Sequence, residues 1–201
     1  MINEISSWLA HHYIELLATI TGLIYLGFSV KGHILLWPFG ILTSGLYVYV
    51  YFTSGIYADM GINVYYVVIS IYGWIHWTFR GGSENVELPV SRLTRVQTLI
   101  LLLITIVIFF LIAYALNNYT DSNIGWWDAF TTALSITATW MLTRKILEHW
   151  LLWIVVDSVS VGLYVYKGLY ITVLLFVVYT TMAVLGYYEW KRQWRKEQSL
   201  Q

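Results

Sequence analysis

Two tryptophans and an aspartate share one side of an apolar segment, where they could bind a small charged molecule. Trp150, Trp153 and Asp157 are spaced by three and four positions, so in an α-helix they lie on one face. Asp157 would lie about two turns, or roughly 10 Å, beyond Trp150. Indole rings stack on flat groups and attract cations, and a carboxylate pairs with a cation or accepts a hydrogen bond. This pattern predicts a binding site for a flat aromatic cation.

Each indole also has a structural explanation. Tryptophans anchor helices at the membrane interface, an alternative that applies to Trp150 more than to Trp153, which lies one turn deeper. A carboxylate at the depth of Asp157 is costly in a membrane and indicates a functional or paired group.

Further candidates for lining the same site lie in other apolar segments. An amide could bind the ring of a substrate or hydrogen-bond between helices, and tyrosines could line a path or pack. No pair of histidines or acids at metal-ligand spacing accompanies them, so neither a metal nor a cofactor is expected. These further candidates are Asn63, Tyr66, Tyr179 and Trp37, the last being the counterpart of Trp150 in an internal repeat.

The composition is that of a membrane protein. Hydrophobic residues make up 59% of the 201 residues and charged residues 11%, with a mean hydropathy of +0.66. A soluble domain carries about 25% charged residues, so this chain has too few to cover a surface in water. Cysteine is absent, which excludes disulfides and thiolate chemistry.

Seven segments are long and apolar enough to be membrane-spanning helices, which need roughly 20 residues. We therefore predict an all-α integral membrane protein, residues 1–201 forming a single membrane domain with a basic tail at 191–201. The predicted helices are Tyr13–Val30, Ile34–Thr53, Met60–Phe79, Gln97–Leu116, Trp126–Thr143, Trp150–Tyr166 and Tyr170–Trp190.

The distribution of basic residues predicts the orientation. Loops on the cytoplasmic side carry an excess of Lys and Arg. With the N-terminus outside, all 11 Lys and Arg residues except Lys167 fall on the cytoplasmic side. We expect a multi-pass protein of the bacterial cytoplasmic membrane with its C-terminus inside, the basic tail lying against anionic lipid.

The internal repeat divides the predicted helices into three, one and three. Residues 55–77 align without a gap on residues 168–190, and a second match, GLYVY at 45–49 and 162–166, has a shift of 117 instead of 113. Repeat one (about 13–79) and repeat two (about 126–190) would be parallel, joined by a linker helix (about 97–116). In transporters with this plan the substrate binds between the halves near the midplane. The matched pairs are Gly55/Gly168, Tyr57/Tyr170, Tyr66/Tyr179, Gly73/Gly186 and Trp77/Trp190.

Nearly the whole chain resembles the Pnu family of vitamin transporters. The resemblance rests on TGLIYLGFSVKGHILLWPFG, YADMGINVYY, YGWIHW and TRKILEHWLLWIVVDSVSVGLYVYKGLY. Nicotinamide riboside members of this family carry W-x-x-W-x-x-x-N, whereas this chain has Asp157 at the last position. The stretch WIVVDSVSVGLYVYKGLY is more similar to the thiamine branch.

The resemblance implies a homotrimer that works by facilitated diffusion, with the vitamin trapped inside the cell through phosphorylation by a cytosolic kinase. Thiamine and nicotinamide riboside both carry a ring cation. Thiamine adds an aminopyrimidine that could form paired hydrogen bonds with a carboxylate, so thiamine is the favoured substrate and nicotinamide riboside the alternative. Proton coupling through Asp157 is a variant of this mechanism.

Two other classes of membrane protein fit the residues less well. A membrane enzyme would need a clustered acid–base set or a metal, and the loops offer only dispersed charges such as Glu84, Glu87, Arg92 and Arg95. A structural membrane protein would not require an acid framed by two indoles. We therefore expect a transporter, not an enzyme, that contacts a vitamin and membrane lipid but no nucleic acid.

Overall fold

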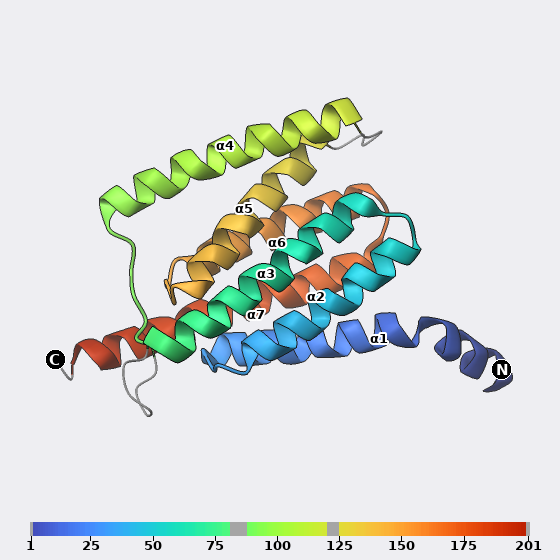
Figure 1. Ribbon diagram of the computed structural model, residues 1–201, viewed down its shortest axis with the longest axis horizontal. Coiled ribbons are helices and arrows are strands. Elements are labelled where there is room, and N and C mark those ends of the chain that lie inside the picture. The colour runs from blue at the N-terminus through green and yellow to red at the C-terminus, as the bar shows by residue number, and fades with distance from the viewer. Residues whose placement is uncertain (1, 81–87, 120–124, 200–201) are drawn as a thin grey trace. The chain divides into compact units, whose positions relative to one another are not determined.

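In the residues that the computed structural model describes, namely 2–80, 88–119 and 125–199, the long regular elements are all α-helices. Side chains are described from residue 13 onward except Ala58 and Arg80. Glu84 and Glu87 lie outside these ranges. Figure 1 shows the helices, which are α1 (Ile2–Lys31), α2 (Leu36–Thr53), α3 (Tyr57–Arg80), α4 (Arg95–Tyr119), α5 (Gly125–Thr143), α6 (His149–Tyr166) and α7 (Tyr170–Gln198).

The helices agree with the predicted segments to within a few residues, with two exceptions. Helix α1 begins at Ile2, well before the predicted start, and α7 continues to Gln198, well beyond Trp190. The basic tail is therefore mostly the last two turns of α7. Basic side chains in the last turn of a helix interact favourably with its dipole.

Among the described residues, four helical segments are long and apolar enough to cross a membrane by length and composition: Tyr13–Lys31, Arg95–Tyr119, His149–Tyr166 and Tyr170–Gln198. Helices α2, α3 and α5 are less apolar because they contain many Tyr, Trp, Ser, Thr and Gly residues. Such residues lower the hydropathy of a helix, although the small ones are typical of helix–helix contacts in membranes.

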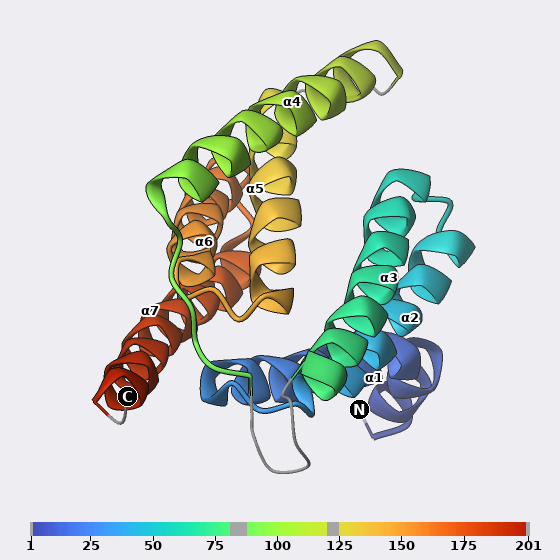
Figure 2. The same cartoon turned by 60° about the vertical axis from the view of Figure 1, so that its left-hand side comes forward.

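The chain divides into two compact units, Met1–Glu87 and Leu88–Gln201. In the first unit α2 packs against both α1 and α3. In the second unit, α4 runs beside α5, α5 packs on α6, and α6 packs on α7 (Figure 2).

In the first unit, α2 and α3 meet through a tryptophan that lies on a glycine. A Cβ atom added to Gly73 would overlap the ring of Trp37. That ring also meets Trp77 edge-to-face, with 5.3 Å between the ring centroids and an interplanar angle of 89°. Within lipid, helices associate through such close packing because no hydrophobic force drives them together.

Helices α6 and α7 meet in the same way in the second unit. A Cβ atom added to Gly186 would lie 2.5 Å from the ring of Trp150, closer than real side chains approach. The Trp150 ring meets Trp190 edge-to-face at 5.9 Å and 87°. Glycine is therefore needed at 186 for close approach.

The turn between α1 and α2 is tight and has a left-handed residue. Gly32 has a φ of +66°, and its N–H donates to the carbonyl of Ser29 at 3.0 Å. The N–H of His33 donates to the carbonyl of Phe28 at 3.0 Å. This pattern of two bonds closes a helix end at an αL residue, where glycine is favoured.

The turn between α5 and α6 has the same two bonds but a lysine at the left-handed position. Lys145, at a φ of +51°, donates through its N–H to the carbonyl of Leu142 at 2.9 Å, and Ile146 donates to Met141 at 3.1 Å. A left-handed conformation costs a non-glycine residue about 1–2 kcal/mol, so other contacts must stabilise this turn.

The turns that follow α2 and α6 have glycine at the left-handed position. Gly55 and Gly168 both have a φ of +72°, with open space where a Cβ atom would lie. Replacing Gly168 with alanine is expected to lower the free energy of unfolding by about 1 kcal/mol, through backbone strain alone. Thermal unfolding in detergent measures this, with Gly45→Ala in helix α2 as the control, because Gly45 is helical and equally open. Equal melting temperatures for the two variants would contradict the strain argument.

Candidate functional site

Helix α6 presents the predicted indoles and the carboxylate on one side. Trp150 is 2% exposed and Asp157 5% exposed, and Trp153 between them is half-buried. Part of Trp153 therefore remains exposed. The heptad spacing of Trp150 and Asp157 directs both towards the same neighbouring helices.

Asp157 is buried without a protein partner in the described part of the chain. Among the residues at 13–79, 88–119 and 125–199, none forms a hydrogen bond or ion pair with its carboxylate. Ser160, one turn later, donates instead to the carbonyl of Val156 at 2.8 Å. A buried acid is costly unless it is paired, so this carboxylate is suited to a partner that arrives with the substrate.

The contacts of Trp150 are with its neighbours at the start of α6 and on α7. Its ring lies 4.5 Å from the ring of His149, which lies 4.6 Å from Trp190. The Nδ1 atom of His149 is 2.7 Å from the carbonyl oxygen of Ile146. This aromatic cluster fixes the first turn of α6 and thereby the direction of the face that carries Trp153.

Trp37 has the corresponding environment in the first unit, fully buried against Gly73 and Trp77. The indole N–H groups of Trp37 and Trp150 have no acceptor among the described residues. The rings of these two tryptophans thus serve first to join helices.

Two candidates on α3 lie in the first unit and are half-buried. The amide nitrogen of Asn63 donates to the carbonyl of Asp59 at 2.9 Å, a bond that leaves the amide oxygen of Asn63 available as an acceptor. Tyr66 lies next to Tyr65, with 5.6 Å between the ring centroids.

Tyr179 belongs to an aromatic row between α6 and α7. Its ring centroid is 5.7 Å from that of Phe176, which stacks on Tyr164 at 5.1 Å. The predicted residues thus fall into two groups, one in each unit: Trp150, Trp153, Asp157 and Tyr179 on α6 and α7, and Trp37, Asn63 and Tyr66 on α2 and α3.

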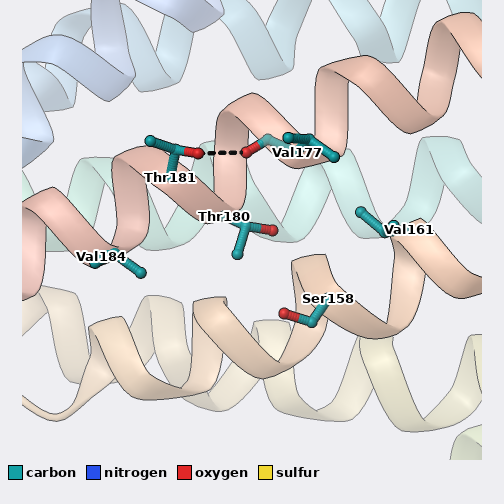
Figure 3. Close-up of a pocket in the computed structure, with 6 residues that line it drawn as sticks. All are labelled: Ser158, Val161, Val177, Thr180, Thr181 and Val184. Atoms are coloured by element: carbon teal, nitrogen blue, oxygen red, sulfur yellow. Dashed lines mark hydrogen bonds between the residues drawn. The ribbon is translucent and has the colours of Figure 1, made fainter.

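A groove of about 420 Å³ runs beside the line where α6 meets α7 (Figure 3). The hydroxyls of two of its residues bond within α7, Thr180 to the carbonyl of Phe176 and Thr181 to that of Val177, each at 2.8 Å. The surface left to a ligand is therefore mostly methyl groups, which suits an apolar group better than a charged vitamin. Its lining residues are Ser158, Val161, Val177, Thr180, Thr181 and Val184.

Two features of this unit were not predicted. His149 was not recognised as part of the aromatic cluster, although it directly precedes Trp150 in the sequence. Segment 88–94 falls between the predicted helices Met60–Phe79 and Gln97–Leu116, and it is hydrogen-bonded to residues before the start of α6 and at the end of α7. No local signal in the sequence indicates such distant partners.

Comparison with known proteins identifies the family. The sequence model of the nicotinamide mononucleotide transporter family matches residues 12–192. The chain is 25% identical over 202 residues to the nicotinamide riboside transporter PnuC of Escherichia coli K12, covering 89% of this chain and 84% of that protein. It is 28% identical over 197 residues to PnuC of Neisseria mucosa, with 92% and 73% covered.

Two further comparisons bear on the substrate and the fold. The riboflavin/roseoflavin transporter RibM of Streptomyces davaonensis is 25% identical over 186 residues, with 91% of this chain and 86% of RibM covered. The crystal structure of the vitamin B3 transporter PnuC matches with a TM-score of 0.75 at 24% identity, covering 96% of this chain and 87% of that one. Because the family model covers most of its length, the chain belongs to the nicotinamide mononucleotide transporter family.

Proposed function

We propose that the chain transports nicotinamide riboside, or a closely similar pyridinium nucleoside, across the bacterial cytoplasmic membrane. The observation that carries the proposal is the face of α6, where a buried carboxylate without a described partner lies one turn from a half-exposed indole. This supports binding of a flat ring that carries a positive charge. The relatives named above are transporters, so the family favours carriage over chemical conversion.

Nicotinamide riboside replaces thiamine as the leading substrate. The sequence favoured thiamine because of Asp157 and its flanking residues, whereas the relatives named above are described as nicotinamide riboside or riboflavin transporters. Both vitamins carry a ring cation, so a carboxylate does not distinguish between them. The thiamine prediction therefore has no support from the comparisons.

In this proposal the pyridinium ring stacks on Trp153 and its charge is balanced by Asp157. Tyr179, on α7 of the same unit, supplies a further ring contact. For Asn63 and Tyr66, which lie in the first unit, substrate binding stays a prediction. Trp150 forms the packed base of this site, and Trp37 has the corresponding packed environment in the first unit. Each part of the substrate thus meets a group whose physical character matches it.

We further propose that the helices form a 3+1+3 parallel repeat within one membrane domain, with α4 as the linker. The support is local. The shift of 113 that aligns the two sequence repeats relates the Trp37–Gly73–Trp77 contact to the Trp150–Gly186–Trp190 contact. The same shift relates the hydrogen bonds of the turns that precede α2 and α6 and the glycines at 55 and 168. Alternating access is the mechanism that such repeats favour.

The remaining parts of the proposal come from charge and family resemblance. All seven helices span the membrane, with the N-terminus outside and the C-terminus in the cytoplasm, as the basic residues indicate. The protein assembles as a homotrimer and works by facilitated diffusion, and a cytosolic kinase traps the vitamin. Its exposed apolar surface, which is extensive along α4, contacts lipid or neighbouring copies.

Calorimetric binding to the detergent-purified protein tests the substrate. Nicotinamide riboside is expected to bind at least tenfold more tightly than thiamine or riboflavin, and Trp153→Ala is expected to weaken it by about 1 kcal/mol or more, roughly fivefold, through loss of ring stacking. Trp127→Ala is the control, because Trp127 is an exposed tryptophan on α5 of the same unit. Thiamine binding as tight as that of nicotinamide riboside would reverse the substrate assignment.

A further inference from the structure

A short extended segment, residues 88–94, is joined to the turn between α5 and α6 by backbone hydrogen bonds. We call it the 88–94 clamp. The N–H of Ser91 donates to the carbonyl of Lys145 at 2.9 Å, and the N–H of Leu147 donates to the carbonyl of Ser91 at 2.9 Å. These two bonds form a parallel β-bridge between Ser91 and Ile146. They flank Ile146, and the first of them binds the carbonyl of Lys145, which stabilises the left-handed backbone of that residue.

Glu148, at the start of α6, binds the same segment through both carboxylate oxygens. One oxygen accepts a hydrogen bond from Nε of Arg92 at 2.8 Å, and the other accepts one from the N–H of Leu93 at 3.1 Å. This hydrogen bond and the negative charge of Glu148 raise the pKa of Arg92 above its ordinary value. The pair is therefore a charge-assisted contact between segments that lie far apart in the sequence.

The basic tail, which forms the last turns of α7, also binds the clamp. The N–H of Val90 donates to the carboxylate of Glu197 at 3.0 Å, and the guanidinium of Arg92 lies 5.2 Å from the centre of the Trp194 ring. Val90 itself is buried. The segment thus connects the approach to α4, the start of α6 and the end of α7.

The turn between α1 and α2 has backbone hydrogen bonds that are all local. In the described part of the first unit, the hydrogen bonds of the backbone N–H groups at 32–37 go to acceptors within residues 28–34. Its left-handed residue is glycine, which adopts this conformation without strain. The two turns therefore have the same internal geometry, and the backbone of the second is in addition bonded to a distant segment.

We propose that the 88–94 clamp keeps the turn between α5 and α6, the start of α6 and the end of α7 together as one rigid body throughout the transport cycle. Glu148 is then a positioning residue: it fixes the first turn of α6 and so the direction of Trp153 and Asp157. Conformational change within a unit is confined to parts that the clamp does not join. Testing this proposal by nicotinamide riboside uptake rests on the proposed function, whereas testing it by amide hydrogen exchange does not.

A disulfide lock tests whether the clamp stays closed. The chain contains no cysteine, so Ser91→Cys with Ile146→Cys gives a single possible bridge, and strand neighbours lie about 4.8 Å apart, within disulfide range. The oxidised variant is expected to take up nicotinamide riboside into proteoliposomes within twofold of the same protein after reduction. Uptake that stops on oxidation and returns with dithiothreitol would show that the clamp opens in each cycle. Failure of the pair to cross-link would also overturn the proposal.

Hydrogen exchange tests the rigidity without any substrate. In the unmodified protein, the amides at 145–149 are expected to exchange at least tenfold more slowly than those at 32–36. Glu148→Gln is expected to speed exchange at 90–93 by at least tenfold and to raise the KM of uptake more than it lowers the maximal rate. Glu189→Gln is the control, because its ion pair with Arg192 lies within α7. Equal exchange in the two turns refutes the clamp, whereas absence of nicotinamide riboside uptake alongside slow exchange at 145–149 refutes only the proposed function.

Discussion

Replacing Asp157 with alanine is expected to weaken nicotinamide riboside binding by at least tenfold, which corresponds to about 1.4 kcal/mol. The reason is the loss of a charge-assisted contact in a buried site, where such contacts contribute about 1.5–3 kcal/mol. Asp157→Asn retains hydrogen bonding without the charge, so its affinity is expected to lie between those of the unmodified protein and Asp157→Ala. Calorimetric titration of the detergent-purified variants measures the effect.

The same substitution is expected to leave the protein as stable as before, or more stable. Asp157 is buried with no described partner, so its removal relieves a desolvation cost and breaks no pair. A fall in affinity with an unchanged or higher melting temperature therefore assigns the carboxylate to binding. Ser158→Ala is the control at the next, exposed position, expected to bind within twofold of the unmodified protein. A large fall in melting temperature for Asp157→Ala would instead assign Asp157 to folding.

Replacing Gly186 with alanine is expected to lower the free energy of unfolding by about 1–3 kcal/mol, the usual cost of overpacking. The added methyl group would lie 2.5 Å from the Trp150 ring, which is itself packed against His149 and Trp190. At about 2–4 °C per kcal/mol for a chain of this size, the melting temperature should fall by several degrees.

Gly162→Ala on α6 is the matched control for Gly186→Ala and is expected to raise the free energy of unfolding instead of lowering it. Gly162 is helical and has open space where the methyl group would lie, so alanine should stabilise the helix by up to about 1 kcal/mol. A double variant, Gly186→Ala with Trp150→Phe, should recover part of the loss because a smaller ring leaves room for the methyl group. Equal changes in melting temperature for the two single glycine variants would contradict the packing argument.

The helices could be predicted from the sequence because each needs only an apolar segment of about 20 residues between polar breaks. Helix α6 was predicted to begin at Trp150 and begins at His149, and α2 was predicted to end at Thr53 and does so. The start of α1 and the end of α7 could not be predicted in this way. Helical residues outside the lipid need not be apolar, so hydropathy does not mark where those helices end.

The close contacts on Gly73 and Gly186 were visible in the sequence only as a match between two segments. Nothing in that match specifies that a ring lies on each glycine, because the tryptophans concerned come from other helices. From the sequence, the second and sixth predicted helices align with a shift of either 113 or 117. In the structure the turn hydrogen bonds and the left-handed residues follow the shift of 113.

The 88–94 clamp was beyond prediction for a different reason. Pro89 and the preceding glycines have a loop composition, and such composition reports only local backbone preference. The bonds that order the segment reach Lys145, Glu148 and Glu197, all of them far along the chain. Pairing at such distances depends on the tertiary fold and has no periodicity that a single sequence reveals.

The two left-handed turns differ in how far they could be transplanted. The turn at Gly32 has its conformational preference in its own residues and hydrogen bonds, so grafting it between two helices of another scaffold should preserve its shape. The turn at Lys145 depends on a strand-like segment that comes from before α4 and α5 in the chain. A graft of that turn alone would relax to another conformation unless glycine replaced the lysine, so a designer of helical hairpins should copy the first turn and leave the second in its native setting.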